Sequence, residues 1–538
     1  MRIYYMKKRL RFVFLFLSLI AVVKLTAQTF GSEEELKAQA AKLFDDDQFE
    51  EAYPLYAQLA SLYNKDANYN YRLGVCMLYA SEDKEKPIPF LELASRSAEV
   101  EKEVFFYLAK AYHLNYRFDD AIKQYHAYEK IASGPKAEKL QVARQIEMCK
   151  NGKQLLRNIS DLMVIDKKEM SRADFYRSYD ITAIGGKLLS KPDEDTFKTA
   201  IDKKKKESSI IYFSSDNNQI YFASYGEDAS NGKDIYLVRK LPNGELSKPQ
   251  TLGYPVNTEY DEDYPFLHPN GKVLYFCSKG HNSMGGYDIF KTTLNELTNT
   301  WNKPVNLDFP INSPDDDILY ITNADEKEAY FSSARSSATG KTAVYHINVD
   351  RKPVDATLVK GTVIKKSQDQ NMNVKITIKD MSDNTILGIF NTNPQSGDFT
   401  LNLPLGGGKV MYTVEAPGFS TQSEIITLPS QTTLAPLKQE ISYGDDGKLA
   451  IKNFFDQPAD QSADENYLAA IKLIKEKSKM EVNVNEITAA ENKRIALGTR
   501  TGTNKPSSTN PTTKPANLSN DEIVKIAYTD AKDAEKEA

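Results

Sequence analysis

The residues that could do chemistry are few and scattered in this chain of 538 residues. His126 and Glu129 have the His-x-x-Glu spacing of two zinc ligands, but the next histidine along the chain is His268. We therefore interpret the pair as surface residues one helical turn apart. Ser283 lies in His-Asn-Ser-Met-Gly, which lacks the first glycine of a Gly-x-Ser-x-Gly nucleophile elbow. Neither a phosphate-binding loop nor a dinucleotide-binding glycine motif is present. The sequence predicts no catalytic residue, no cofactor and no enzyme.

Metal binding is not supported either. The histidines number five, at positions 113, 126, 268, 281 and 346. The acidic clusters at 261–263 and 315–317 could attract calcium, but they lack the Asp-x-Asp-x-Asp-Gly spacing of a loop that wraps around the ion. Carboxylates that cap turns between strands are the favoured interpretation. The three cysteines are too few for a four-ligand zinc site, and two of them, Cys76 and Cys149, fall among apolar helical positions that predict buried thiols.

Composition sets the broad class of the protein. At roughly 150 residues per domain, the length suggests three or four domains. Lys and Arg together number 69 and Asp and Glu 74, so the net charge of −5 gives no electrostatic footprint for nucleic acid. The single tryptophan, against 31 tyrosines and 24 phenylalanines, argues modestly against a glycan-binding module.

The N-terminal residues have the three regions of an export signal. Basic residues dominate 1–11, an apolar run occupies 12–23, and Ala27 precedes Gln28. The apolar run is shorter than the roughly 20 residues that a membrane span needs. We expect a signal peptide over 1–27, cleaved near Ala27, and a mature chain without a transmembrane segment. An uncleaved anchor is the alternative.

Residues 31–157 contain a helical repeat. Ala40, Gly74 and Ala109 begin segments with the same internal spacing, at steps of 34 and 35 residues. Small residues at these positions, and at 52 and 121, let paired helices approach closely, although Lys86 breaks the pattern in the second unit. The spacing resembles the tetratricopeptide repeat, which implies an α-solenoid. A further single helix is expected over 135–157 as its cap, with Leu140, Ala143, Ile146 and Met148 or Cys149 facing inward.

A solenoid of this kind has a concave groove that suits a peptide or a partner helix. The groove residues expected to contact a partner are Lys110 and His113 on the first helix of the third unit. A structural spacer that binds nothing is the alternative interpretation.

A β pattern with a period of 54 to 55 residues follows over 208–350, and the β domain that we expect from it spans 160–350. Gln219-Ile-Tyr-Phe-Ala-Ser224 returns at 273–278 and 328–333, and Gly232-Lys-Asp-Ile-Tyr236 returns at 286–290. Residues with a period-2 alternation, interrupted by Asn-Gly and Gly-Gly turn signals, indicate short antiparallel strands. The run from His268 to Phe276, followed by Gly-x-Asp-Ile, resembles the propeller repeat of TolB. The resemblance implies a small β-propeller, whose blade number the repeats leave open.

The remaining chain divides into three parts. Strand patterns over 356–436 resemble the carboxypeptidase regulatory-like domain, which implies a transthyretin-like β-sandwich without an activity of its own. Residues 441–500 form a poorly defined helical segment, with helical spacing over 467–477. Residues 501–538, rich in Thr, Asn, Pro and Ser at first, are expected to be a disordered tail with a short helix.

The order of these parts is similar to the PorE-type OmpA-family envelope proteins of Bacteroidota, which are associated with type IX secretion and gliding. Residues 451–456 are similar to the strand that opens an OmpA-like domain, but the Gly-His-Thr-Asp segment that grips peptidoglycan does not follow. The resemblance implies a non-catalytic scaffold in the periplasm or at the outer membrane, which binds envelope proteins through the helical groove and the propeller face. An accessory module for glycan or peptidoglycan fragments is the alternative, although peptidoglycan binding is not expected.

Overall fold

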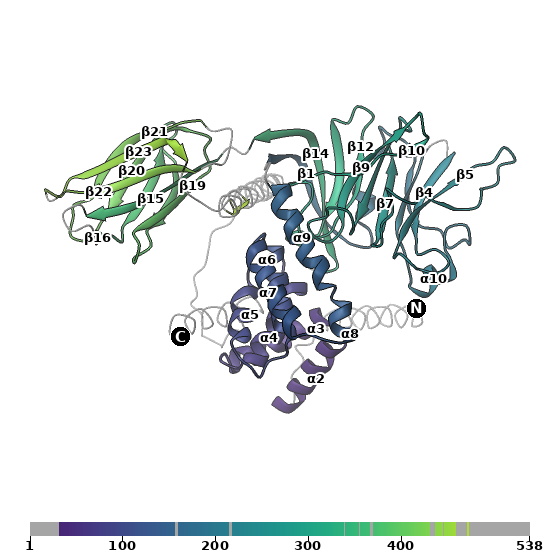
Figure 1. Cartoon of the computed structure of the whole chain (residues 1–538), viewed down its shortest axis with the longest axis horizontal. Helices are drawn as coiled ribbons and strands as arrows, with labels where there is room; N and C mark the ends of the chain where they lie inside the picture. The colour runs from purple at the N-terminus through teal and green to yellow at the C-terminus, as the bar shows by residue number, and fades with distance from the viewer. Residues whose placement is uncertain are drawn as a thin grey trace, which may run out of the picture. The chain divides into compact units, whose positions relative to one another are not determined.

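The computed structural model confirms a mixed α plus β architecture, in which helices precede several β-sheets (Figure 1). The expected signal peptide over 1–27 and the expected tail over 501–538 lie outside the described residues, as does almost all of 459–500. The described residues are 32–156, 160–214, 218–337, 339–353, 356–365, 370–430, 436–444, 446–458, 468, 471 and 472.

The described chain forms two compact units, and the helices are divided between them. The first unit holds residues 32–80 and 89–101, and the second holds 81–88 and everything described from 102 onwards. The helices of the N-terminal region are α2 (Glu33–Asp45), α3 (Phe49–Leu62), α4 (Ala67–Ala80), α5 (Pro87–Ser95), α6 (Glu103–Leu114), α7 (Phe118–Ile131), α8 (Pro135–Lys139) and α9 (Val142–Leu155).

Small residues do bring helices together, as the repeat pattern predicts. Ala40, Ala52, Ala109 and Ala121 are completely buried. A Cβ atom on Gly74 would lie 2.7 Å from the Leu91 side chain, so a larger residue there would separate α4 from α5. Local signals begin the first helix, because the Ser32 hydroxyl accepts the Glu35 N–H at the amino end of α2.

The expected single helix over 135–157 is two helices. Gln141 separates α8 from α9 and has a left-handed backbone conformation, with a φ of 46°. The break changes which residues face inward on α9: Ile146, Met148 and Cys149 are buried as predicted, but Ala143 is exposed and Val142 and Arg144 are buried instead.

Residues 160–353 form the first β region, which also contains a short 3-10 helix at Phe175–Ser178 and α10 (Ala200–Lys204). Its sheets have the strand orders β2-β3, β4-β5-β6, β10-β9-β8-β7 with β11 beside β9, and β1-β14-β13-β12. The strands are β1 (Ser160–Ser171), β2 (Lys187–Ser190), β3 (Ile210–Phe213), β4 (Gln219–Ser224), β5 (Asp234–Arg239), β6 (Gln250–Thr251), β7 (Glu262–Leu267), β8 (Val273–Ser278), β9 (Asp288–Asn295), β10 (Thr300–Trp301), β11 (Val305–Asn306), β12 (Asp317–Thr322), β13 (Glu328–Ser333) and β14 (Lys341–Pro353).

The two ends of the first β region meet in one sheet. β1, its first strand, pairs antiparallel with β14, its last, with Lys168 opposite Val344 and Met170 opposite Thr342. The strands are also more buried than simple alternation predicts, because every residue of β8 and of β12 is buried. Alternate side chains of β8 enter two different cores, with Tyr275 and Cys277 in one and Leu274 and Phe276 in the other, so apolar side chains are favoured on both faces of this strand.

Residues 356–458 form the second β region, in which two sheets share one hydrophobic core. One sheet has the order β16-β15-β22-β23 with β19 beside β15, and the other has the order β18-β17-β20-β21. The strands are β15 (Thr357–Lys365), β16 (Gln370–Asn371), β17 (Lys375–Asp380), β18 (Ile386–Asn391), β19 (Asp398–Leu403), β20 (Gly408–Glu415), β21 (Gln422–Leu428), β22 (Leu437–Tyr443) and β23 (Leu449–Pro458).

This core extends past residue 436, where the sequence pattern placed its end. β22 pairs in parallel with β15, and β23 pairs with β22, so residues up to 458 belong to the sheet rather than to a helical segment that begins at 441. Leu437, Ile441 and Tyr443 are buried in the shared core, and this burial explains why the chain continues as strands.

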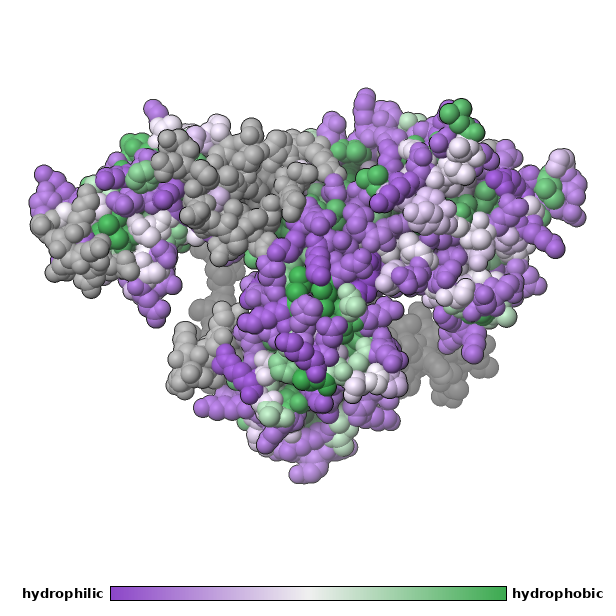
Figure 2. Space-filling model, viewed as in Figure 1, coloured by the Kyte–Doolittle hydropathy of each residue, from purple (hydrophilic) through white to green (hydrophobic). Residues whose placement is uncertain are grey.

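No helix in the described part of the chain is both long enough and apolar enough to cross a membrane. Hydrophilic residues dominate the coloured surface in Figure 2, with apolar residues in small scattered groups.

Candidate partner-binding site

The two residues predicted to line a binding groove lie on α6 in the second unit. His113 is only 4% exposed, and its Nε2 lies 2.7 Å from the carbonyl oxygen of Met284 in the first β region. Burial lowers the pKa of His113 to about 4, so the ring is neutral near pH 7 and donates its Nε2 proton to that carbonyl. Lys110, one turn earlier, is partly buried. The His113 ring therefore attaches α6 to the first β region.

Arg144 on α9 makes the most extensive contact with the first β region. Its guanidinium donates to the carbonyl oxygen of Lys279 at 2.6 Å and to the hydroxyl of Ser283 at 2.8 Å. It also lies over the ring of Tyr260, 4.5 Å from the ring centroid. Because the Arg144 side chain is 4% exposed, these acceptors satisfy a cation that would otherwise be costly to bury.

Two further contacts join the helices to the first β region, and one of them is made with the same loop, which spans residues 279–284. Asn151 on α9 donates to the Ser283 carbonyl oxygen at 3.1 Å. Tyr116, between α6 and α7, packs edge-on against Phe309 with 5.9 Å between ring centroids. Buried polar contacts from α6 and α9 thus fix the helices of the second unit to the first β region. Ser283, the residue of the incomplete nucleophile motif, has a structural role here.

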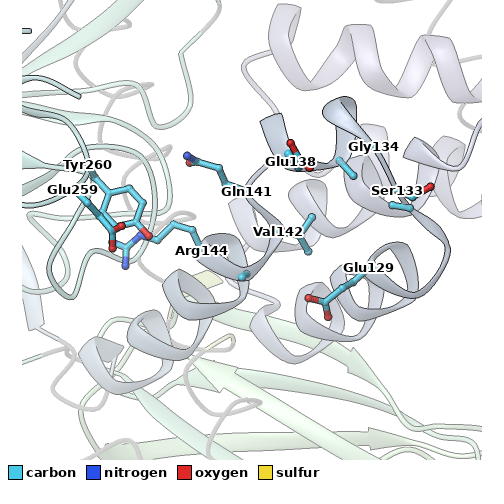
Figure 3. A pocket seen from close by; sticks show the side chains of 12 residues that line it. Glu129, Ser133, Gly134, Glu138, Gln141, Val142, Arg144, Glu259 and Tyr260 are labelled. Atoms are coloured by element: carbon cyan, nitrogen blue, oxygen red, sulfur yellow. The ribbon is translucent and has the colours of Figure 1, made fainter. Parts of the chain in front are cut away.

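A pocket of about 540 Å³ opens beside this contact (Figure 3). In Figure 3, Arg144 extends from α9 towards Tyr260 and Glu259, while Glu129, Ser133 and Gly134 lie on the opposite side. The volume falls within the range of ligand pockets. The lining comes from the end of α7, from α8, from the start of α9 and from one loop of the first β region: Glu129, Ala132, Ser133, Gly134, Ala137, Glu138, Gln141, Val142, Ala143, Arg144, Glu259 and Tyr260.

The charges of the lining favour a cation. Glu129, Glu138 and Glu259 contribute three exposed carboxylates, whereas Arg144 is engaged by the loop at 279–284. Two helix ends also border the pocket with opposite effects, because the carboxyl end of α7 attracts cations and the amino end of α9 attracts anions. The three carboxylates therefore decide that the pocket favours a positively charged ligand. Glu129 lies 3.1 Å from His126, and both are about half exposed, which agrees with their interpretation as a surface pair.

A second polar feature lies among the repeat loops of the first β region, and we name it the charged cluster. Arg172 pairs with Asp316 at 2.8 Å, Lys279 pairs with Asp261 at 3.0 Å, and Lys233 pairs with Asp263. The Tyr287 ring lies beside two of these pairs, because Lys279 Nζ lies 4.6 Å and Lys233 Nζ 5.7 Å from its centroid. Its members are Arg172, Lys233, Asp261, Asp263, Lys279, Tyr287 and Asp316.

Carboxylates of the two acidic segments accept hydrogen bonds from backbone N–H groups at equivalent positions of successive repeats. Asp261 accepts the Lys233 N–H at 3.0 Å, and Asp316 accepts the Tyr287 N–H at 3.1 Å. Burial alone would raise the pKa of Asp316, but Arg172 and Lys279 outweigh it and lower that pKa. In the described part of the chain, no group of three or more His, Cys, Asp or Glu side chains is arranged to hold a metal ion.

Comparison with known proteins assigns no family. No protein-family model matches the chain, and no curated protein matches it significantly. The resemblances drawn from its motifs therefore remain predictions.

The sequence did not reveal Arg144 or the pocket. Arg144 stands among apolar positions of α9, where an arginine normally marks the solvent face, and its acceptors lie more than 130 residues along the chain. A usable signal was available, however, because an arginine in the middle of an apolar face needs a buried partner.

Proposed function

We propose that the protein is a non-catalytic scaffold of the periplasm or the outer membrane, which holds protein partners of a type IX secretion or gliding assembly. In this proposal the helical pairs are tetratricopeptide repeats, the first β region is a small TolB-like propeller, and the second is a transthyretin-like sandwich. The pairing of β1 with β14 supports the propeller, since joining the first and last strands closes a ring of sheets. The two sheets with one core support the sandwich.

The pocket beside Arg144 is the observation that carries the binding function. Its walls come from α7, α8, α9 and the loop at 259–260, and the buried contacts of Arg144 hold those walls in place. A pocket whose walls are already in place binds with a smaller loss of conformational entropy than one that must form on binding. We propose that a lysine or arginine side chain of an envelope protein enters it, because Glu129, Glu138 and Glu259 surround the opening.

Crosslinking in intact cells followed by purification of this chain tests the proposal. The combined change of Glu129, Glu138 and Glu259 to Gln should reduce a crosslinked partner at least tenfold, and the remaining binding should depend less on salt. A control with the same change of charge on exposed residues of the first β region should keep the partner: Glu227→Gln, Glu245→Gln and Glu296→Gln. Equal loss in both variants, or retention of the purified chain on isolated cell wall in place of a protein partner, would contradict the scaffold.

A further inference from the structure

Two loops of the first β region are built alike. Tyr254-Pro-Val-Asn257 and Phe309-Pro-Ile-Asn312 occupy equivalent places in successive repeats. The Asn257 side chain accepts the N–H of Ile235 at 2.9 Å and donates to its carbonyl oxygen at 3.1 Å. Asn312 makes the same two bonds with Ile289, at 2.8 and 2.9 Å. Each asparagine therefore fixes its loop to the strand of the preceding repeat in the same way.

Side chains from elsewhere in the first β region also form hydrogen bonds with a carbonyl oxygen of each loop. Arg335 donates to the carbonyl oxygen of Pro310 at 2.5 Å, and His281 Nε2 lies 2.9 Å from the carbonyl oxygen of Val256. The aromatic residue at the start of each loop is thus presented by an anchored backbone. Such a residue loses little conformational freedom when another surface covers it.

The two aromatic residues differ in what covers them. Phe309 is 3% exposed, because Tyr116 at the corner between α6 and α7 packs edge-on against it with an interplanar angle of 88°. Tyr254 is 88% exposed. The equivalent position thus carries a large aromatic ring in both repeats, but only the second ring is covered by a helical corner in the described part of the chain.

We propose that the Tyr254 loop is a docking site for the corner between two antiparallel helices of a partner protein. The corner would place an aromatic or long apolar side chain against Tyr254, as Tyr116 does against Phe309. The loop at 254–257 adjoins the established contact between the helices and the first β region, because the carbonyl oxygen of His281 accepts from Arg144. The new surface therefore adjoins an interface that the helices already form.

This inference rests on the proposed scaffold function and adds a second surface to it. The test is to replace Tyr254 in the full chain by a benzophenone-bearing phenylalanine, irradiate intact cells, and map the crosslinked residue of the partner by mass spectrometry. The same replacement at Leu297, which is 97% exposed in the same region, is the matched control. The expected adduct joins Tyr254, but not Leu297, to a helix–helix corner of another protein.

Adducts on a non-helical segment, on glycan or on a second copy of this chain would overturn the proposal, and so would equal labelling from both positions. Once the partner is identified, Tyr254→Ala should weaken its binding about 10- to 30-fold and Tyr254→Phe should retain it. Because Tyr254 is exposed, neither change should alter the melting temperature. The pocket at Glu129, Glu138 and Glu259 is unchanged in these variants, so loss of this docking site is distinguishable from failure of the scaffold function.

Discussion

Replacing Arg144 should release α9 from the first β region without unfolding the rest of the chain. Arg144→Ala removes the charged donor from two acceptors, the part-buried Lys279 carbonyl oxygen and the buried Ser283 hydroxyl. Each such loss costs about 1–3 kcal/mol, and the loss of the contact with Tyr260 adds about 0.5–1 kcal/mol. A local cost of about 3 kcal/mol, near the low end of the sum of these ranges, raises the open fraction of the helix at least about 100-fold.

Hydrogen exchange followed by mass spectrometry measures this opening directly. Amides of α9 should exchange about 100-fold faster in Arg144→Ala, whereas amides of β20 in the second β region should be unchanged. Arg144→Lys keeps the charge but lacks the planar fork of donors, so its effect should be intermediate. Lys150→Ala, an exposed position on the same helix, is the control and should leave exchange unaltered. If α9 in Arg144→Ala exchanged within threefold of the unmodified chain, the buried arginine would not hold this interface.

Three further predictions concern buried groups. Burial raises the pKa of Glu262 to about 7 from an ordinary value of 4.5, so its neutral form stabilises the fold at low pH and that contribution is lost as pH rises towards 7. From pH 5.5 to 7.5 the loss is about 2 kcal/mol. Glu262→Gln should therefore remove that part of the pH dependence of stability, measured by urea unfolding followed by the fluorescence of Trp301, the single tryptophan. An unchanged pH dependence would contradict a raised pKa for Glu262. Gly361→Ala places a Cβ against the backbone oxygen of Gln439 on β22, so amide exchange in β15 and β22 should increase while that in β8 does not. Gly152→Ala places a Cβ against the Phe118 ring and should lower the stability of the α7–α9 contact by about 1–3 kcal/mol. Proteolysis at the α7–α8 connection no faster than in the unmodified chain would contradict this.

Local sequence patterns predicted the types of element well. Repeated small residues predicted close helix contacts, and Ala40, Ala52, Ala109 and Ala121 are indeed buried. Cys76 and Cys149 are buried free thiols, as their apolar neighbours indicated. These predictions succeeded because the periodicity of helices and strands depends on residues close together in the sequence. Repeats also show the same pattern more than once.

The boundaries of the elements and the strands with which they pair were predicted less well. β22 was missed as part of the second β region because it pairs in parallel with β15, about 80 residues earlier, and parallel pairing leaves no hairpin signal in the sequence. The break at Gln141 was missed because a left-handed residue other than glycine has no strong local signature.

The sequence by itself determined the periodicities, which are those of paired helices and of three strand repeats. Only the tertiary structure decided which distant surfaces those elements contact. His113, predicted to face a partner, faces Met284, and Arg144 is buried against a loop more than 130 residues away. Equivalent loops even differ, because Tyr116 covers Phe309 and leaves Tyr254 exposed. Periodicity depends on residues a few positions apart, whereas burial of a given side chain depends on which distant surface packs over it.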